Sequence, residues 1–377
     1  MHIKYITNVR IPTPRAQGYA IMKMCSEFAK NFAEVQLFVP ERESSELKGD
    51  PFQFYNINKN FEIRKVPSFD FLGKTLRFGK LFYWVDMLSF FIMSRFTIDL
   101  GKDDLLYTRD FFTALFFSKS SNMILELHDI PKSKFLFKLA IKKFRLFFVL
   151  NNNLKQELVI MGVEESIIFI SPSGVEISEF NINMDKEVAR EKMGLPQDKN
   201  IIMYTGHLYG WKGADTLAEA AISMPETLFI FVGGVEPEFS KFIKKYKNYS
   251  NIVARPFVER HIIPIYLQSA DVLVLPNSGK EKISARYTSP LKLLEYMASN
   301  RPIVASKLSS ILEVVSDREC IFAEADNPIS FSSSIRKVLD DSVLAKDISK
   351  NALNKVEQFS WGNRVKNILS IINNHTQ

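Results

Sequence analysis

A glycine-rich segment in the second half of the chain, residues 204–215, carries side chains suited to holding a phosphate. Gly206 and Gly213 would let the backbone come close to a ligand, and a helix is expected to begin directly after the second of them. His207 and Lys212 add two potential cations to the same loop. Flexible backbone, a helix start and positive charge together favour a diphosphate site, and the alternative is an exposed lysine in an ordinary loop.

A second segment, residues 287–298, runs from a loop into a helix and could complete such a site. Lys292 lies in the expected first turn of that helix, where backbone N–H groups can hold a phosphate. Glu295 follows three residues later and could accept hydrogen bonds from the hydroxyls of a ribose. The alternative is that Glu295 forms an ordinary ion pair with Lys292 on the surface of the helix.

The first half of the chain offers weaker candidates at the ends of expected strands. Gly18 precedes a helix-like run over residues 19–31 and serves either a turn or the approach of a ligand. His128 and Asp129 end one strand, and Arg109 follows another. By itself, a histidine at such a position is more often structural than catalytic.

Short β-rich runs, separated by helix-length amphipathic stretches, must position these residues. The expected strands are residues 3–6, 35–39, 61–66, 105–107, 124–127, 146–150, 167–170, 201–204, 228–232, 272–275, 302–305 and 321–322. Alternating strands and helices predict an α/β fold with two Rossmann-like, doubly wound parallel sheets, separated near residues 171–174. Ligands bind beyond the carboxyl ends of such strands, so the expected site is a cleft between the two domains.

Composition excludes several classes of protein. The 377 residues are 46% hydrophobic and 24% charged, which excludes a largely disordered chain. Two cysteines cannot make a disulfide framework or a thiolate metal cluster, and a reducing cytoplasm is expected. No signal peptide or spanning segment is evident, so the chain is expected to be soluble or to lie on a membrane. The net charge of +7 permits an anionic partner without identifying one.

Taken together, the motifs resemble the GT-B glycosyltransferases of retaining family four (glycosyl transferases group 1). The resemblance covers nearly the whole chain and rests on the order and spacing of several segments. They are residues 171–176, 204–215, 270–276, 289–305 and 359–361. The resemblance implies an acceptor-binding domain over residues 1–171 and a nucleotide-sugar donor domain over residues 172–357. A last helix, about residues 358–377, would pack back on the first domain.

The same resemblance implies roles for individual residues. It makes His128, Lys212 and Glu295 the catalytic candidates, with Lys212 on the diphosphate and Glu295 on the ribose. The implied donor-binding residues are Gly18, Gly206, His207, Lys212, Gly213, Ser289, Pro290, Leu291, Lys292 and Glu295. Arg109 and Asp129 are the candidates for the acceptor side of the cleft.

Two positions depart from the family pattern. His207 lies where the family often has a phosphate-binding arginine, and Tyr287 replaces a glutamate that commonly touches the donor sugar. The family mechanism implies retention through attack on the face that the leaving group departs from, with the departing phosphate assisting deprotonation of the acceptor. No Asp-x-Asp signature or metal-ligand cluster is evident, so we expect catalysis without a metal or other cofactor.

A basic stretch stands apart from these motifs. Residues 130–156 contain seven basic residues and no acidic one. Four of them fall on one stripe of an expected helix: Lys134, Lys138, Lys142 and Arg145. Such a stripe fits an anionic membrane surface, and the alternative is a solvated helix face whose apolar side is core. The aromatic-rich residues 81–91 are interpreted as core or as part of an acceptor groove.

The sequence therefore predicts a glycosyltransferase that moves a sugar from a UDP- or GDP-sugar to a saccharide or lipid-linked saccharide. It is expected in the cytoplasm or at the inner face of a membrane. A nucleotide-sugar epimerase of similar fold and a non-catalytic nucleotide-sugar-binding protein are the alternatives. Nucleic-acid binding, which rests on charge alone, is not expected.

Overall fold

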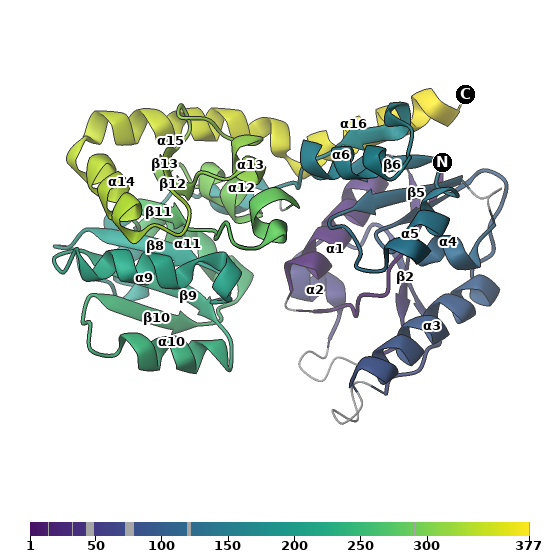
Figure 1. The fold of residues 1–377 in the computed structure, drawn as a ribbon, viewed down its shortest axis with the longest axis horizontal. Coiled ribbons are helices and arrows are strands. Elements are labelled where there is room, and N and C mark those ends of the chain that lie inside the picture. The colour runs from purple at the N-terminus through teal and green to yellow at the C-terminus, as the bar shows by residue number, and fades with distance from the viewer. Residues whose placement is uncertain are drawn as a thin grey trace. The chain divides into compact units, whose positions relative to one another are not determined.

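The computed structural model describes residues 1–13, 15–31, 33–42, 49–71, 79–118, 122–287, 289 and 291–376 (Figure 1). The chain divides into two compact units, one formed by residues 1–171 with residues 361–377 and the other by residues 172–360. Each unit contains its own parallel sheet with helices around it, which confirms the predicted α/β fold class of two doubly wound sheets.

The sheet of the first unit has seven parallel strands in the order β3-β2-β1-β4-β5-β6-β7. They are β1 (His2–Ile6), β2 (Glu34–Pro40), β3 (Glu62–Val66), β4 (Asp104–Thr108), β5 (Asn122–Leu127), β6 (Leu146–Val149) and β7 (Ile168–Ile170). All seven match strands expected from the sequence. The order reverses between β1 and β4, so the crevice beyond the carboxyl ends of these two strands is where a doubly wound sheet binds ligands.

Helices of the first unit connect these strands and include the end of the chain. They are α1 (Ala16–Lys30), α2 (Pro51–Tyr55), α3 (Gly79–Thr97), α4 (Thr113–Phe116), α5 (Lys134–Ile141), α6 (Asn152–Ile160), η1 (Glu165–Ile167) and α16 (Trp361–Thr376). The terminal helix α16 packs against α1, and the buried ring of Trp361 meets Tyr19 edge-on at 6.5 Å. This packing brings residues from opposite ends of the chain into one core.

The second unit has six parallel strands in the order β10-β9-β8-β11-β12-β13. They are β8 (Ile201–Thr205), β9 (Leu228–Gly234), β10 (Ile252–Pro256), β11 (Val272–Leu275), β12 (Ile303–Ser306) and β13 (Ile321–Ala323). Five were expected, and β10 was missed. It is an edge strand that ends in Arg255 and Pro256 and is only partly buried, so it lacks the apolar run of a central strand.

Helices cover both faces of this second sheet. They are α7 (Ile177–Phe180), α8 (Lys186–Met193), η2 (Gly210–Lys212), α9 (Ala214–Ile222), α10 (Glu238–Tyr246), η3 (Arg260–Ile262), α11 (Ile263–Ser269), a π-helical turn (Ile283–Tyr287), α12 (Leu291–Ala298), α13 (Ser309–Leu312), α14 (Pro328–Asp340), α15 (Ser342–Val356) and η5 (Glu357–Phe359). One apolar core lies on each face of the sheet. The strand order reverses between β8 and β11, so the loops after these two strands should frame any ligand site.

Across the part of the chain described, no helix has both the length and the apolar character needed to cross a bilayer.

Candidate functional site

The loop after β8 is held closely against the loop after β11. Gly213 has a φ of +75°, and a Cβ there would lie 1.7 Å from the carbonyl oxygen of Pro276. Gly206 also has a positive φ, +125°, and its N–H donates to Val232 O at 2.6 Å. A side chain fits at neither position without strain, so both glycines are required by the backbone path. The expected glycine turn and the helix that follows it, α9, are both present.

Two lysine ammonium groups converge on this loop. The Nζ of Lys292, from the first turn of α12, would lie 2.8 Å from a Cβ on Gly206 and stands 4.0 Å from the ring centroid of Tyr204. This Nζ is buried, and none of the described residues gives it a hydrogen-bond partner. The Nζ of Lys212 stands 3.8 Å from the ring centroid of Trp211.

The electrostatics of the two lysines follow from this burial. Burial lowers the pKa of Lys212 to about 8. Burial also lowers the pKa of Lys292 well below its usual value, and the neighbouring charge of Lys212 lowers it further. The charge of Glu295 raises the pKa of Lys292 without offsetting the burial, so both protonated forms remain disfavoured. An anion bound at the end of β8 would stabilise them.

Glu295 projects from α12 one turn after Lys292, but it does not pair with that lysine. Its carboxylate accepts a hydrogen bond from Nη1 of Arg260 at 2.9 Å. Arg260 also pairs with Glu179 at 3.2 Å and lies over the ring of Phe180. The alternative of an ordinary Lys292–Glu295 surface pair is therefore wrong, since the carboxylate is fixed by a guanidinium from η3.

The start of α12 is fixed by hydrogen bonds to a distant segment. Ser289 is buried, its Oγ accepts from Ser173 N–H at 3.1 Å, and its carbonyl accepts from Ser173 Oγ at 3.1 Å. Leu291 opens the helix, whereas the predicted Pro290 lies outside the described residues. Tyr287 is buried at the end of the π-helical turn, so a phenol stands where the resemblance implies a carboxylate.

His207 lies on the same loop as Lys212, directly after Gly206. Its carbonyl oxygen accepts a hydrogen bond from the Tyr204 hydroxyl at 2.7 Å, and its half-buried ring lies 5.1 Å from the ring of Tyr209. The donor residues predicted in the second unit, Pro290 aside, thus belong to two segments: the loop after β8 and the start of α12.

Two residues near this site were missed by the sequence analysis. Arg260 had no signal, because its partner Glu295 lies 35 positions away. Asn277 follows Pro276 and is 1% exposed, yet neither its amide nitrogen nor its amide oxygen has a hydrogen-bond partner among the described residues. A buried amide without partners is costly, so Asn277 offers a donor and an acceptor to a ligand or water at the Gly213 turn.

In the first unit, the side chains at the ends of β4 and β5 surround a buried carboxylate, Glu126. This residue is fully buried, and Tyr107 donates its hydroxyl to Oε2. Arg109 Nη2 lies 2.7 Å and Arg364 Nη2 lies 3.1 Å from Oε1. His128 Nε2 lies 2.6 Å from the same oxygen. The carboxylate therefore connects two predicted residues, Arg109 and His128, to helix α16.

Burial and neighbouring charges set the ionisation of this cluster. Burial would raise the pKa of Glu126, but Arg109 and Arg364 outweigh it and hold that pKa well below its usual value. Burial and the charge of Arg109 lower the pKa of His128 to about 4, although Glu126 opposes this shift. Near neutral pH the two guanidinium ions thus share the carboxylate of Glu126 beside a neutral imidazole, and the carboxyl group of Asp110 also interacts with Arg109.

The neutral imidazole has a defined tautomer. An ionised carboxylate only accepts hydrogen bonds, so the proton of His128 lies on Nε2, which faces Glu126. Nδ1 is then the acceptor. Because the side chain is 36% exposed, His128 can offer this lone pair to a hydroxyl group of a bound molecule.

Glu126 and Arg364 were not among the predicted site residues. Glu126 carried a signal, because a carboxylate interrupts an otherwise apolar run, residues 123–127. Arg364 carried none, because 238 positions separate it from Glu126.

The structure explains two further predicted residues locally. At Gly18, a Cβ would collide with the Tyr55 hydroxyl at 2.2 Å and with the Thr13 methyl group at 2.5 Å. Packing of α1 against these side chains is therefore enough to require the glycine. Asp129 is exposed just after β5, and its carboxylate accepts from the N–H of Ile130 at 2.8 Å.

The basic stripe is shorter than predicted, because α5 ends at Ile141. Lys142 caps the helix, and a turn over residues 142–145 leads directly into β6. Arg145 therefore leaves the stripe and donates instead to Asn122 and to the carbonyl of His375. The lysines that remain exposed on this surface are Lys134, Lys138 and Lys142.

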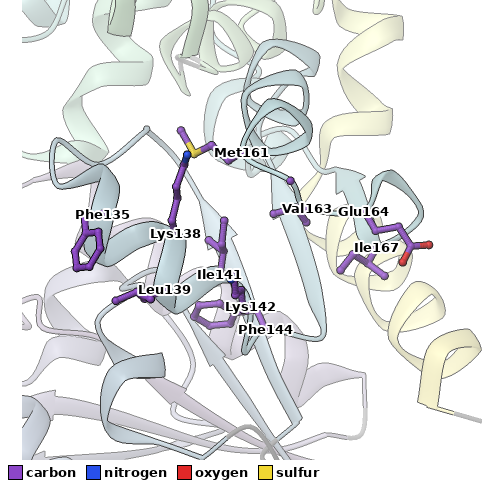
Figure 2. A pocket seen from close by; sticks show the side chains of 11 residues that line it. Phe135, Lys138, Leu139, Ile141, Lys142, Phe144, Met161, Val163, Glu164 and Ile167 are labelled. Atoms are coloured by element: carbon purple, nitrogen blue, oxygen red, sulfur yellow. The ribbon is translucent and has the colours of Figure 1, made fainter.

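Large apolar side chains lie between these lysines. Phe135 is 74% exposed and Leu139 is 47% exposed. Beside α5 is a cavity of about 440 Å³, lined by Lys138, Lys142 and Glu164 and by apolar residues of α5 and of the segments after α5 and α6 (Figure 2). The alternative that the apolar residues beside the stripe are all core is therefore wrong for Phe135 and Leu139.

Within the described ranges, no three His, Cys, Asp or Glu side chains lie close enough together to hold a metal ion.

Residues 185–355 match the family model of Glycosyl transferases group 1. The chain is 25% identical over 234 residues to a D-inositol 3-phosphate glycosyltransferase from Acidothermus cellulolyticus, covering 58% of this chain and 50% of that protein. It is 26% identical over 175 residues to the lipopolysaccharide glucosyltransferase WaaG from Escherichia coli, covering 44% of each. The chain spans about half the length of the curated relatives it matches.

Solved structures resemble the chain over nearly its full length. A sucrose-phosphate synthase from Thermosynechococcus elongatus has a TM-score of 0.77 at 15% identity, covering 99% of this chain and 98% of that one. Anabaena HepE in complex with UDP-glucose has a TM-score of 0.74 at 14% identity, covering 99% and 100%. These likenesses confirm the predicted GT-B fold.

Proposed function

We propose that the protein is a glycosyltransferase, because residues 185–355 match the family model of Glycosyl transferases group 1. It would move a sugar from a nucleotide-diphosphate sugar to a saccharide or lipid-linked saccharide acceptor. The observation that carries this proposal is the pair of lysines at the end of β8, whose pKa values burial lowers and of which Lys292 Nζ has no hydrogen-bond partner among the described residues. A diphosphate provides the two negative charges that such a pair requires.

In this proposal each donor residue has a defined task. Lys212 and Lys292 bind the diphosphate and stabilise the negative charge that grows on it as the sugar leaves. Asn277 and the backbone of the Gly213 turn add hydrogen bonds beside them. Glu295, held by Arg260, accepts hydrogen bonds from the ribose hydroxyls.

We propose retention of configuration without a metal ion. The two lysines supply the positive charge at the leaving group, and the departing phosphate accepts the proton of the attacking hydroxyl. His128 contributes as a neutral hydrogen-bond acceptor through Nδ1, because its pKa of about 4 keeps it uncharged at neutral pH. Glu126 and Arg109 keep the imidazole in that tautomer and orientation.

The donor base is proposed to be uracil or guanine, and uracil should be tested first. Anabaena HepE, which shares the fold, is described in complex with UDP-glucose. For the acceptor, the name of WaaG, a lipopolysaccharide glucosyltransferase, supports a lipid-linked saccharide. An acceptor of this kind would place the protein at a membrane, and we propose peripheral association with an anionic surface through Lys134, Lys138 and Lys142.

Thermal unfolding in the presence of UDP, GDP, ADP and the matching nucleotide sugars tests the donor site. A ligand at 100 times its Kd stabilises the protein by about 2.7 kcal/mol. We expect UDP or GDP to raise the unfolding temperature, and we expect most of this rise to be lost in Glu295→Gln. The matched control Glu191→Gln, on an exposed position of α8, should retain it.

Transfer is tested separately, with radiolabelled UDP-sugars and membrane extracts as acceptors. Donor binding without transfer or hydrolysis would favour the alternative of a non-catalytic binding protein. Tyr287 supports this alternative, because a buried phenol replaces the glutamate that commonly touches the donor sugar. No shift with any nucleotide would contradict the proposed donor site.

A further inference from the structure

Helix α3 of the first unit has one face in the core and one apolar face turned outward. Met87, Phe90 and Phe91 are buried. Every fourth residue on the other side is exposed and apolar, which places these residues on one stripe of the helix. They are Trp84, Leu88, Ile92 and Phe96, with exposed fractions of 42%, 40%, 45% and 81%.

We call these four residues the α3 row. Tyr83 and Met93, both exposed, extend it sideways. A row of this length is unusual on a protein surface, because removing each apolar side chain from water would lower the free energy. The aromatic-rich stretch is thus only partly core, and its outer side is available to a partner.

Charge around the α3 row indicates which partner fits. The single carboxylate of α3, Asp86, is buried and accepts a hydrogen bond from Phe71 N–H at 3.0 Å. Helix α4 contacts both α3 and α5, so the three helices lie side by side (Figure 1). Lys134 and Lys138 of α5 and Lys142, which caps it, are exposed and lie within a stretch of 27 residues (130–156) that contains no acid.

An anionic bilayer matches this combination of features. Its interface takes up tryptophan, tyrosine and other apolar side chains, while its phosphates attract lysines. We infer that the α3 row inserts into the interface of an anionic bilayer, with the α5 lysines on lipid phosphates beside it. This inference rests on the membrane association proposed above and identifies the element that inserts.

Trp84 provides a direct test of insertion, since the chain has only two other tryptophans. Trp361 is buried and Trp211 lies in the second unit. The full-length protein is titrated with vesicles of phosphatidylglycerol and phosphatidylcholine, and with phosphatidylcholine alone. We expect a blue shift of emission and quenching by brominated acyl chains with the anionic vesicles. Trp84→Phe, which keeps an aromatic ring on Phe112, should abolish both signals.

Vesicle sedimentation gives a second readout that needs no tryptophan. The double variant Leu88→Ser/Ile92→Ser should weaken binding to anionic vesicles at least tenfold. The matched control Ile329→Ser/Val343→Ser removes two apolar side chains that are 78% and 70% exposed on the second unit, and it should bind as wild type does.

Three outcomes would overturn the inference. They are failure of the wild type to bind anionic vesicles, equal binding by the Leu88/Ile92 variant, and a monomer–dimer change in that variant with vesicle binding intact. The last outcome would assign the α3 row to a second copy of the chain. The UDP thermal shift, measured on the same preparations, reports separately whether the proposed donor site is valid.

Discussion

The pKa of Lys212 leads to a quantitative prediction for nucleotide binding. Burial lowers this pKa to about 8, and no neighbouring charge contributes to the shift. If the diphosphate binds only the protonated lysine, the fraction of protein able to bind falls as the pH rises through this value. The affinity for UDP should therefore decrease as the pH rises from 7 through 8 to 9.

The magnitude follows from the titration of one group. With a pKa of about 8, Lys212 is protonated in roughly ten elevenths of the protein molecules at pH 7 and in one eleventh at pH 9. The Kd should rise about tenfold between these values, which corresponds to about 1.4 kcal/mol. In the wild type the rise should be steeper, because burial also lowers the pKa of Lys292 and adds a second titrating group to the site.

Titration calorimetry with UDP at pH 7, 8 and 9 measures this dependence. Lys292→Met isolates the contribution of Lys212 and should show the tenfold change. Lys212→Arg carries a charge at all three values and should flatten the profile when combined with Lys292→Met. Repeating the titration in buffers of different ionisation enthalpy gives the number of protons taken up. A Kd of Lys292→Met that stays within twofold from pH 7 to pH 9 would refute the reasoning.

Two further substitutions test the architecture of the sites. Gly213→Ala places a methyl group against the Pro276 carbonyl at a φ of +75°. It should lower the unfolding temperature by several degrees and abolish the rise in that temperature caused by UDP. Gly210→Ala, where the space is open, should have neither effect. Glu126→Gln leaves two buried guanidinium ions poorly paired and should destabilise the first unit by about 3–5 kcal/mol, read from amide exchange of β5 in urea. Glu62→Gln, in the exposed ion pair with Arg64, is its control. An equal loss of stability in this control would contradict the prediction that the buried cluster contributes more than a surface ion pair.

The fold was predictable because its signals are local. Each central strand is an apolar run buried on both faces of a parallel sheet, and helix-length segments separate the runs. The same reasoning failed where an element is only partly buried or ends early. Strand β10 lies at an edge and ends in Arg255 and Pro256. Helix α5 stops at Ile141 because the chain must turn to enter β6, and spacing alone could not indicate this end.

The candidate site was predictable only where loop sequence and loop function coincide. Gly206, Lys212 and Gly213 lie within eight positions, so their convergence follows from the glycines themselves. The partners that fix the charged groups lie far away in sequence. Arg260 reaches Glu295 across 35 positions, and Arg364 reaches Glu126 across 238. Such contacts arise only after the sheet and the terminal helix have packed.

Buried cations occur in each unit near the point where its strand order reverses. In the second unit, Lys212 follows β8 and Lys292 lies beside it. In the first unit, Arg109 follows β4 and shares the carboxylate of Glu126 with Arg364. Burying a charge costs free energy that a partner returns only in part, so these residues lower stability unless something else selects them. Binding of an anion at each crevice would recover that loss, which is why ligand binding should stabilise the protein more strongly than a comparable surface contact.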